Sequence, residues 1–371
     1  MHKFIKRTLQ LAAIGIVFGA NSLYAKSTVG GIIFTNVYFS HLDSDKLANN
    51  ITKLNVIVPT NSRLRMRWDN EDSVGMYIEV GFGSGTELKI RHAYGKWDIN
   101  EKWQVLAGHT STPFAPLNPQ VSMVHNSGDG FGNPNPSRQS QVRFTYKFLN
   151  RQGAVALAIL DPNTGVSYDN NITGEVILKE SRTPRFDIGA VYKTFNMQIF
   201  PSAFYTQTQY EDTFADNLDI WGVSVGLRTA LGRFTFASEV AAGQNWGNTK
   251  MSDVNNINGD SRTAAIRVGD KLVNNNVTKG WIDIGYRFAG DTFKGEFHMV
   301  AGYDKAKSAD NSVKQEYLNK MYGISVPIDM PWIGRGFRLR PELFRYVELD
   351  RVNADADRTE TIVGVQVQVT F

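Results

Sequence analysis

Regular alternation of apolar and polar side chains is the feature that most limits what this 371-residue chain can fold into. In residues 363–371, four valines and a final phenylalanine occupy every second position, and Gly, Gln and Thr stand between them. The same alternation recurs at 63–68, 74–82, 142–148 and 223–228. Successive side chains on a β-strand point to opposite faces, so each such segment predicts a strand with one apolar and one polar face. The sequence therefore predicts an all-β fold.

The alternating segments and the connectors between them predict sixteen strands. The expected ranges are 29–39, 62–69, 74–82, 87–97, 102–109, 138–148, 153–161, 183–194, 195–207, 218–230, 233–246, 280–288, 292–304, 316–328, 336–347 and 359–371. After residue 25, no apolar run approaches the roughly 18 residues that a membrane-spanning helix needs. The absence of such a run does not exclude a protein that crosses a membrane with strands, because alternating strands average to a polar composition.

The connectors between the expected strands alternate in length. The short ones are 69–73, 98–102, 149–153, 195–196, 231–232 and 289–291, and the long polar ones are 40–61, 110–137, 162–182, 208–217, 247–279, 305–315 and 348–358. One five-residue connector, 83–87, departs from this order. The alternation predicts a 16-stranded antiparallel transmembrane β-barrel over 26–371, with long extracellular loops and short periplasmic turns. We expect the barrel to be closed, because lipid cannot satisfy an open sheet edge.

Both ends of the chain point to export. Residues 1–25 combine a basic start, an apolar stretch over 8–20 and a small final residue, which predicts a secretory signal peptide. At the other end, Phe371 closes an alternating strand and resembles the terminal aromatic signal of bacterial outer-membrane barrels. We therefore expect a location in the bacterial outer membrane, in contact with its lipid. Tryptophans near strand ends fit the aromatic girdles of such barrels: Trp68, Trp97, Trp103, Trp221, Trp281 and Trp332.

Composition excludes several other classes of protein. The chain has no cysteine, which excludes disulfides, thiolate metal sites and a cysteine nucleophile. It has 40 Lys and Arg against 36 Asp and Glu, and three of the basic residues lie in the first 25. The remainder is almost neutral, whereas a nucleic-acid-binding protein carries a basic surplus. We expect no nucleic-acid partner, no metal and no cofactor.

If the apolar positions face lipid, the alternate positions face the lumen of the barrel. The basic residues that this rule places inside are Arg63, Arg65, Arg67, Lys89, Arg91, Arg143, Arg185, Arg228, Arg338 and Arg340, and Glu79 lies among them. Such a wall attracts anions in a confined channel, and the guanidinium group binds a carboxylate with two hydrogen bonds. The alternative is that inward acids on other strands neutralise the arginines and leave a weakly selective pore. Those acids are Glu79, Asp187, Glu239, Asp283 and Glu342.

The segment 110–137 is the connector after the fifth strand and is rich in proline and glycine, which disfavours both helix and strand. In general porins the loop at this place folds inward and narrows the pore. That resemblance makes 110–137 a constriction loop and places His125, Asn126, Ser127 and Asp129 near the constriction. A loop that points outward is the alternative.

Two motifs resemble the DcaP-like porins. The first is Arg91-His92-Ala93-Tyr94-Gly95 with the strand that follows at 102–114, and the second is the segment 136–144 after the proline-rich connector. The resemblance is clearest over residues 60–150. It implies a 16-stranded, trimeric outer-membrane channel that favours anionic solutes such as dicarboxylates. It also assigns Arg91, Arg138 and Arg143 to the channel wall.

We therefore expect a porin for passive diffusion of small hydrophilic, preferentially anionic solutes, and not an enzyme. One alternative is a plugged structural or adhesion barrel, which requires large apolar side chains facing inward or a plug; the inward positions read as charged, Gly, Ser or Gln. A further alternative is an outer-membrane hydrolase with a Ser–His pair, such as Ser111 with His109 or Ser127 with His125. The sequence lacks the G-x-S-x-G motif of many such hydrolases.

Overall fold

The computed structural model describes residues 25–44, 51–82, 88–121, 124–125, 132–136, 138–162, 168–169, 176–177, 179–181, 183–210, 217–249, 263–268, 271–311, 316–350 and 358–371. The expected signal peptide lies outside these ranges except for its last residue. No helix in the described ranges is long and apolar enough to cross a membrane.

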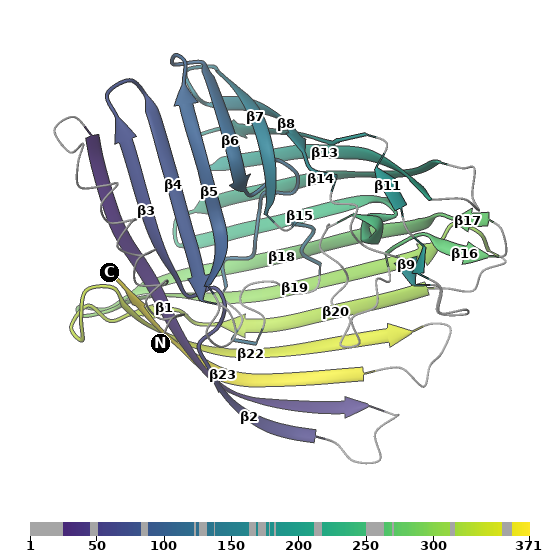
Figure 1. The fold of residues 1–371 in the computed structure, drawn as a ribbon. Coiled ribbons are helices and arrows are strands. Elements are labelled where there is room, and N and C mark those ends of the chain that lie inside the picture. Colours follow the sequence, from purple (N-terminus) through teal and green to yellow (C-terminus); the bar gives the residue numbers. More distant parts are fainter. Residues whose placement is uncertain are drawn as a thin grey trace, which may run out of the picture.

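The described chain is built almost wholly of strands (Figure 1). They are β1 (Ala25–Ser44), β2 (Ile51–Ile57), β3 (Arg63–Asn70), β4 (Val74–Phe82), β5 (Leu88–Asp98), β6 (Trp103–Thr110), β7 (Gln139–Phe148), β8 (Gly153–Leu160), β9 (Tyr168–Asp169), β10 (Val176–Ile177), β11 (Lys179–Ser181), β12 (Arg185–Lys193), β13 (Met197–Tyr210), β14 (Asn217–Leu231), β15 (Phe234–Gln244), β16 (Ile266–Val268), β17 (Lys271–Val273), β18 (Asn275–Ala289), β19 (Lys294–Ser308), β20 (Glu316–Ser325), β21 (Ile328–Asp329), β22 (Phe337–Asp350) and β23 (Arg358–Thr370). One 3₁₀ turn, η1 (Trp246–Asn248), follows β15.

These strands form a closed, 16-stranded antiparallel barrel, which confirms the predicted fold class. The seam joins the first and last strands, with β1 and β23 paired from Ile32↔Thr370 to Ser44↔Arg358. Three barrel strands are interrupted and carry two labels each: β2 with β3 against β1, β11 with β12 against β13, and β20 with β21 against β19. Every barrel strand therefore has two neighbours, and the sheet has no open edge that lipid would leave unsatisfied.

Two connectors hold more structure than the sequence indicated. The connector expected at 40–61 is largely a hairpin, because β1 runs on to Ser44 and pairs with β2. Within 247–279, β16 and β17 form a small separate ladder, and β18 already begins at Asn275. Both extensions lengthen the walls at the end of the barrel that carries the long loops. They leave the number of barrel strands at sixteen.

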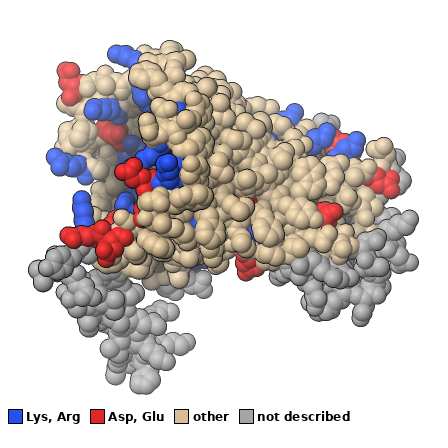
Figure 2. All heavy atoms as spheres, turned by 90° about the horizontal axis from the view of Figure 1, so that it is seen from above, with Lys and Arg blue, Asp and Glu red and all other residues tan. Residues whose placement is uncertain are grey.

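The outer face of the barrel is apolar, as the alternation requires. Val223 and Val225 on β14 are 50% and 52% exposed, while Ser224 between them is buried. Figure 2 shows the same division: Lys, Arg, Asp and Glu gather around a hollow at one end, and few of them interrupt the wall between the two ends. An exposed apolar band of this kind is the surface that a barrel presents to lipid tails.

The inner face is less uniformly polar than expected. Inward positions on the strands from β13 to β23 carry large apolar side chains such as Ile220, Met321, Phe344 and Ile362, each at most 1% exposed. Trp281, expected in an aromatic girdle, is also 3% exposed and packs inside the barrel with Leu117 and Ala237. The expectation that inward positions are charged, Gly, Ser or Gln is therefore wrong for this part of the wall. The reason is that 110–137 enters the lumen and needs an apolar surface to pack against.

Candidate functional site

The connector 110–137, called loop 3 below, lies inside the barrel over its described residues. Its backbone N–H groups donate to side chains on the inner wall at widely separated strands. Ala115 donates to Ser202 Oγ of β13 (3.0 Å), Gln120 to Asp283 Oδ2 of β18 (2.6 Å) and Gly132 to Asp304 Oδ1 of β19 (2.6 Å). Further along the wall, Val124 donates to Glu342 Oε2 of β22 (2.5 Å), and the Val124 carbonyl accepts from Asn36 Nδ2 of β1 (2.6 Å). Loop 3 therefore follows the inner face from β13 round to β1.

Apolar contacts hold loop 3 against the same arc of strands. The Phe114 ring meets Phe204 and Trp246 edge-on, with ring centroids 4.7 and 5.8 Å apart. Val121 and Val124 lie in a second cluster with Phe344 and five other buried side chains. Burial of these side chains favours one fixed position for the loop, since a loop in water would leave them exposed.

Three of the acids that were expected to balance the arginines contact loop 3 or groups on strands outside the β3–β7 arc. Asp283 Oδ1 also lies 2.8 Å from His298 Nδ1, and Glu342 Oε1 accepts from Ser325 (2.7 Å). Asp187 Oδ1 and Oδ2 accept from Arg185 (2.7 and 2.9 Å), and both side chains are fully buried. None of these contacts, as described, reaches the strands from β3 to β7.

Beyond Ser111, the described residues of loop 3 leave the arc from β3 to β7 uncovered, and this arc is strongly basic. Strand registers and burial place eight cationic and three acidic side chains on its inward positions. They are Arg63, Arg65, Arg67, Lys89, Arg91, Lys96, Arg143 and Lys147, with Asp69, Glu79 and Asp98. This arc therefore carries a surplus of five positive charges on one wall.

Glu79 is the centre of the arc and is 4% exposed. Its Oε2 lies 3.2 Å from Arg63 Nε, and its Oε1 accepts from Arg91 Nε (2.9 Å). Tyr77 Oη also donates to Oε2 (2.8 Å). One carboxylate thus positions two guanidinium groups, and charge-assisted contacts of this kind are the stronger class of hydrogen bond.

A β-bulge brings side chains to the lumen that the alternation had placed outside. The register between β4 and β5 shifts between Glu79 and Val80, so that Glu79 faces His92 while Gly81 faces Lys89. Arg91 and His92 therefore both face inward, and Tyr94 follows. His92 Nδ1 lies 2.7 Å from Thr110 Oγ1, and Arg138 Nε contacts His92 Nε2 at 2.9 Å. Strict alternation misses His92 and Tyr94, because a bulge adds one residue to one strand only.

The predicted basic residues fall into two groups. Arg63, Arg65, Arg67, Lys89, Arg91, Arg138 and Arg143 lie on or beside the β3–β7 arc. Arg143 donates to Gln141 Oε1 from Nε (3.0 Å) and Nη2 (2.8 Å) and to the Ser111 carbonyl, where loop 3 begins. Arg67 donates to Asp69 (2.5 Å), and Lys89 is exposed.

The other predicted arginines lie outside the β3–β7 arc, on β12, β14 and β22. Arg185 is fully buried beside Asp187 and over the Phe204 ring (4.4 Å), and Arg340 donates to Gln366 Oε1 (2.9 Å) at 6% exposure. Arg338 pairs with Asp329, and Arg228 lies on β14 near Glu239. The structure therefore does not bring all the predicted arginines into one row.

Of the four residues expected at the constriction, Asn126, Ser127 and Asp129 lie outside the described ranges. His125 lies near the wall, where its Nε2 is 3.6 Å from Glu360 of β23. Its ring contacts Tyr38 and Tyr346, with centroids 6.0 and 5.5 Å away. Burial lowers the pKa of His125 below its usual value, and the Glu360 carboxylate opposes this effect.

The closed barrel, its apolar outer face and its inward loop define the class of outer-membrane β-barrels with a loop in the lumen. The comparisons with solved structures agree with this class. The outer membrane channel DcaP of Acinetobacter baumannii has a TM-score of 0.73 at 17% identity, over 95% of this chain and 99% of that one. An anion-selective porin from Comamonas acidovorans has a TM-score of 0.60 at 11% identity, over 94% and 100%. OmpT of Vibrio cholerae, an outer membrane protein solved in trimer form, has a TM-score of 0.54 at 11% identity, over 94% and 100%.

These likenesses confirm the resemblance to DcaP-like porins at the level of the fold, and they support a bacterial outer-membrane location. No protein-family model matches the sequence, and no curated protein is similar to it in sequence.

Proposed function

We propose that this chain is an outer-membrane porin through which small hydrophilic solutes diffuse passively, with a preference for anions such as dicarboxylates. The observation that carries the proposal is the distribution of charge across the lumen. The described residues of loop 3 cover the arc from β13 to β1, and the β3–β7 arc, which they leave open beyond Ser111, carries the surplus of cations. A solute that passes loop 3 therefore moves along a basic wall.

The pairing within that wall leaves charge available to solute. Glu79 neutralises part of the positive charge of Arg63 and Arg91. Arg65 and Lys89, in contrast, have no ion pair among the described residues. Arginine favours carboxylates because its planar group offers two parallel donors. Lys89 is exposed and Arg65 is partly exposed, so a solute bound to them stays partly hydrated and can be released, which diffusion through a channel requires.

A neighbour described as an anion-selective porin supports the same preference. We further propose a homotrimer, supported by the trimer form of the OmpT neighbour, and the native mass of the detergent-solubilised protein tests it. The role of 110–137 as the constriction loop is part of the proposal, and the wall contacts of Ala115, Gln120 and Val124 support it.

The experiment is the reversal potential of the refolded protein in a planar bilayer with a KCl gradient. The proposal expects step-like conductance and a potential displaced toward the chloride equilibrium value. Replacing Arg65→Gln together with Lys89→Gln is expected to lower the chloride-to-potassium permeability ratio about two- to fivefold, since the two salt-screened charges together contribute up to about 1 kcal/mol. The matched control is Lys102→Gln, which removes an exposed charge from a short turn.

The other outcomes separate the alternatives. A potential on the potassium side would overturn the anion preference and leave a porin of the opposite selectivity. Absence of conductance from protein that migrates as a folded, heat-modifiable barrel would favour the plugged barrel, which the packing of loop 3 against Phe344 and its neighbours makes a specific alternative.

A further inference from the structure

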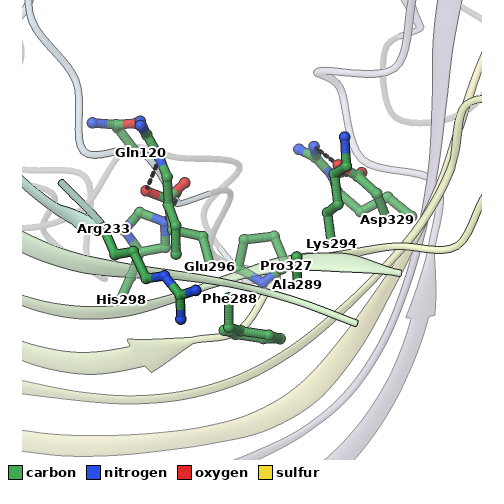
Figure 3. A pocket seen from close by; sticks show the side chains of 12 residues that line it. Gln120, Arg233, Phe288, Ala289, Lys294, Glu296, His298, Pro327 and Asp329 are labelled. Carbon is green, nitrogen blue, oxygen red and sulfur yellow. Dashed lines mark hydrogen bonds and ion pairs between the residues drawn. The ribbon is translucent and has the colours of Figure 1, made fainter. Parts of the chain in front are cut away.

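A cavity of about 430 Å³ lies at the end of the lumen that carries the short turns. Its lining comes from the β14–β15 turn, from β18, β19, β21 and β22, and from Gln120 of loop 3 (Figure 3). A volume of this size suits a small molecule. The cavity belongs to the arc that loop 3 covers and is separate from the β3–β7 arc.

Four cationic and two acidic side chains line the cavity, and each acid is already paired. Glu296 Oε1 accepts from Thr235 Oγ1 (2.8 Å) and lies 3.3 Å from Arg287 Nε. Asp329 accepts from both Nε (2.6 Å) and Nη2 (2.9 Å) of Arg338. The two acids therefore balance Arg287 and Arg338.

Arg233 and Lys294 supply the remaining two positive charges. Neither has an ion pair among the residues that the structure describes, and both are exposed to solvent. In Figure 3 they lie toward different ends of the lining. His298, also in the lining, is 1% exposed and lies 2.8 Å from Asp283 and 3.5 Å from Glu296, so two carboxylates already surround it.

Two unpaired cations toward different ends of one small cavity match a ligand with two anionic groups. We propose that this cavity is a second binding site for small dicarboxylates, on the periplasmic side, in which Arg233 binds one carboxylate and Lys294 binds the other. The inference rests on the proposed function, because the ligand reaches the cavity through the same channel. It also predicts that binding differs between the two ends of the channel, which the β3–β7 arc alone does not imply.

The test uses single-channel recordings of the full chain with succinate added first to one side and then to the other. Each channel has one orientation, so the two sides can be compared within a single channel. In the wild type, succinate is expected to interrupt the current for longer from one side. The double variant Arg233→Gln/Lys294→Gln is expected to shorten those longer interruptions on the order of tenfold, because it removes two charge-assisted contacts.

The matched control is Lys102→Gln/Lys193→Gln, which removes two exposed charges from the same end of the barrel but not from the cavity lining. It is expected to keep the wild-type difference between the sides. Acetate, with one carboxylate, is expected to show no such difference in the wild type. Lys294→Gln alone, on protein that stays heat-modifiable, provides a milder variant with the same direction of change.

The inference is overturned if the cavity variants keep the wild-type asymmetry, if the control loses it equally, or if acetate reproduces it. Its failure can be told from failure of the proposed function. An anion-selective wild-type channel without the expected asymmetry contradicts the cavity alone, whereas a wild-type channel that is not anion-selective contradicts the proposed function.

Discussion

Individual side chains in this barrel have roles that their residue type alone does not reveal. Arg65 and Arg185 are both inward arginines, yet the first has no ion pair among the described residues and the second is fully buried beside Asp187. A buried and paired guanidinium contributes to packing and register, because its charge is already satisfied. Selectivity should therefore respond to substitutions on the β3–β7 arc and much less to substitutions at Arg185.

His125 gives a prediction at this scale. Burial lowers its pKa in the folded protein and Glu360 partly opposes this, so the unfolded chain binds a proton at higher pH than the folded one. This histidine therefore lowers stability as the pH falls below about 6.5, until the folded state is protonated as well. We expect His125→Gln to remove this part of the pH dependence. The measurement is the denaturant midpoint of both proteins between neutral and acidic pH.

The comparison between the two proteins isolates His125, since the other histidines are present in both. Parallel midpoints of wild type and variant across the whole pH range would contradict the prediction.

At the scale of elements, loop 3 and the inner wall form one packed unit. Asp283, Asp304 and Glu342 lie on three strands that are far apart in sequence from the loop, and each accepts a backbone N–H from it. Apolar side chains on the same strands fill the space between these contacts. The described part of the loop therefore has a position fixed by both hydrogen bonds and burial.

Replacing Asp283→Asn together with Glu342→Gln is expected to weaken the attachment of loop 3 by about 1–3 kcal/mol, because hydrogen bonds to charged acceptors are stronger than those to amides. The expected result is larger fluctuation of the open-channel current in single-channel recordings. The matched control is Asp291→Asn/Glu101→Gln, which makes the same chemical changes at exposed turns. Current noise equal to that of the control would show that these carboxylates do not fix the loop.

At the scale of the whole molecule, closure of the barrel depends on the seam between β1 and its neighbours. Gly31 and Phe371 exchange backbone hydrogen bonds of 2.9 and 3.2 Å, although Phe371 lies just beyond β23. A Cβ added at Gly31 would lie 2.6 Å from the Phe371 ring and 2.9 Å from the Arg63 carbonyl oxygen. At this end of the seam the backbones and the Phe371 ring therefore leave no room for a side chain at position 31.

Gly31→Ala is accordingly expected to destabilise the closed barrel by about 1–3 kcal/mol, in the range for overpacking of a close contact. The measurement is the temperature at which the folded band is lost in heat-modifiability gels. Gly334→Ala is the control, because a Cβ at that position meets nothing within 4 Å. Equal melting of the two variants would contradict a special role for Gly31 in closure.

Much of the architecture follows from local patterns that can be recognised in the sequence. Alternation over 74–82 and 363–371 predicts both the strand and the face that meets lipid, because the side-chain period of a strand is two. The alternating connector lengths predict which ends of neighbouring strands are joined by short turns. These two signals were sufficient to predict the number of barrel strands, the closure of the barrel and the inward position of most basic residues on the β3–β7 arc.

What the sequence by itself determined is the sixteen-stranded barrel and its two faces, since these depend on neighbours along the chain. The tertiary structure alone decided three further features. A bulge at Glu79 and Val80 turns Arg91 and His92 to the same side, which no period of two can produce. Loop 3 packs on Phe344 and Ile220, which explains apolar residues on an inward face. Finally, acids such as Asp283 and Glu342 contact partners that are distant in sequence, and only the fold determines which cations stay unpaired, because charge balance depends on distance in space and not on spacing in sequence.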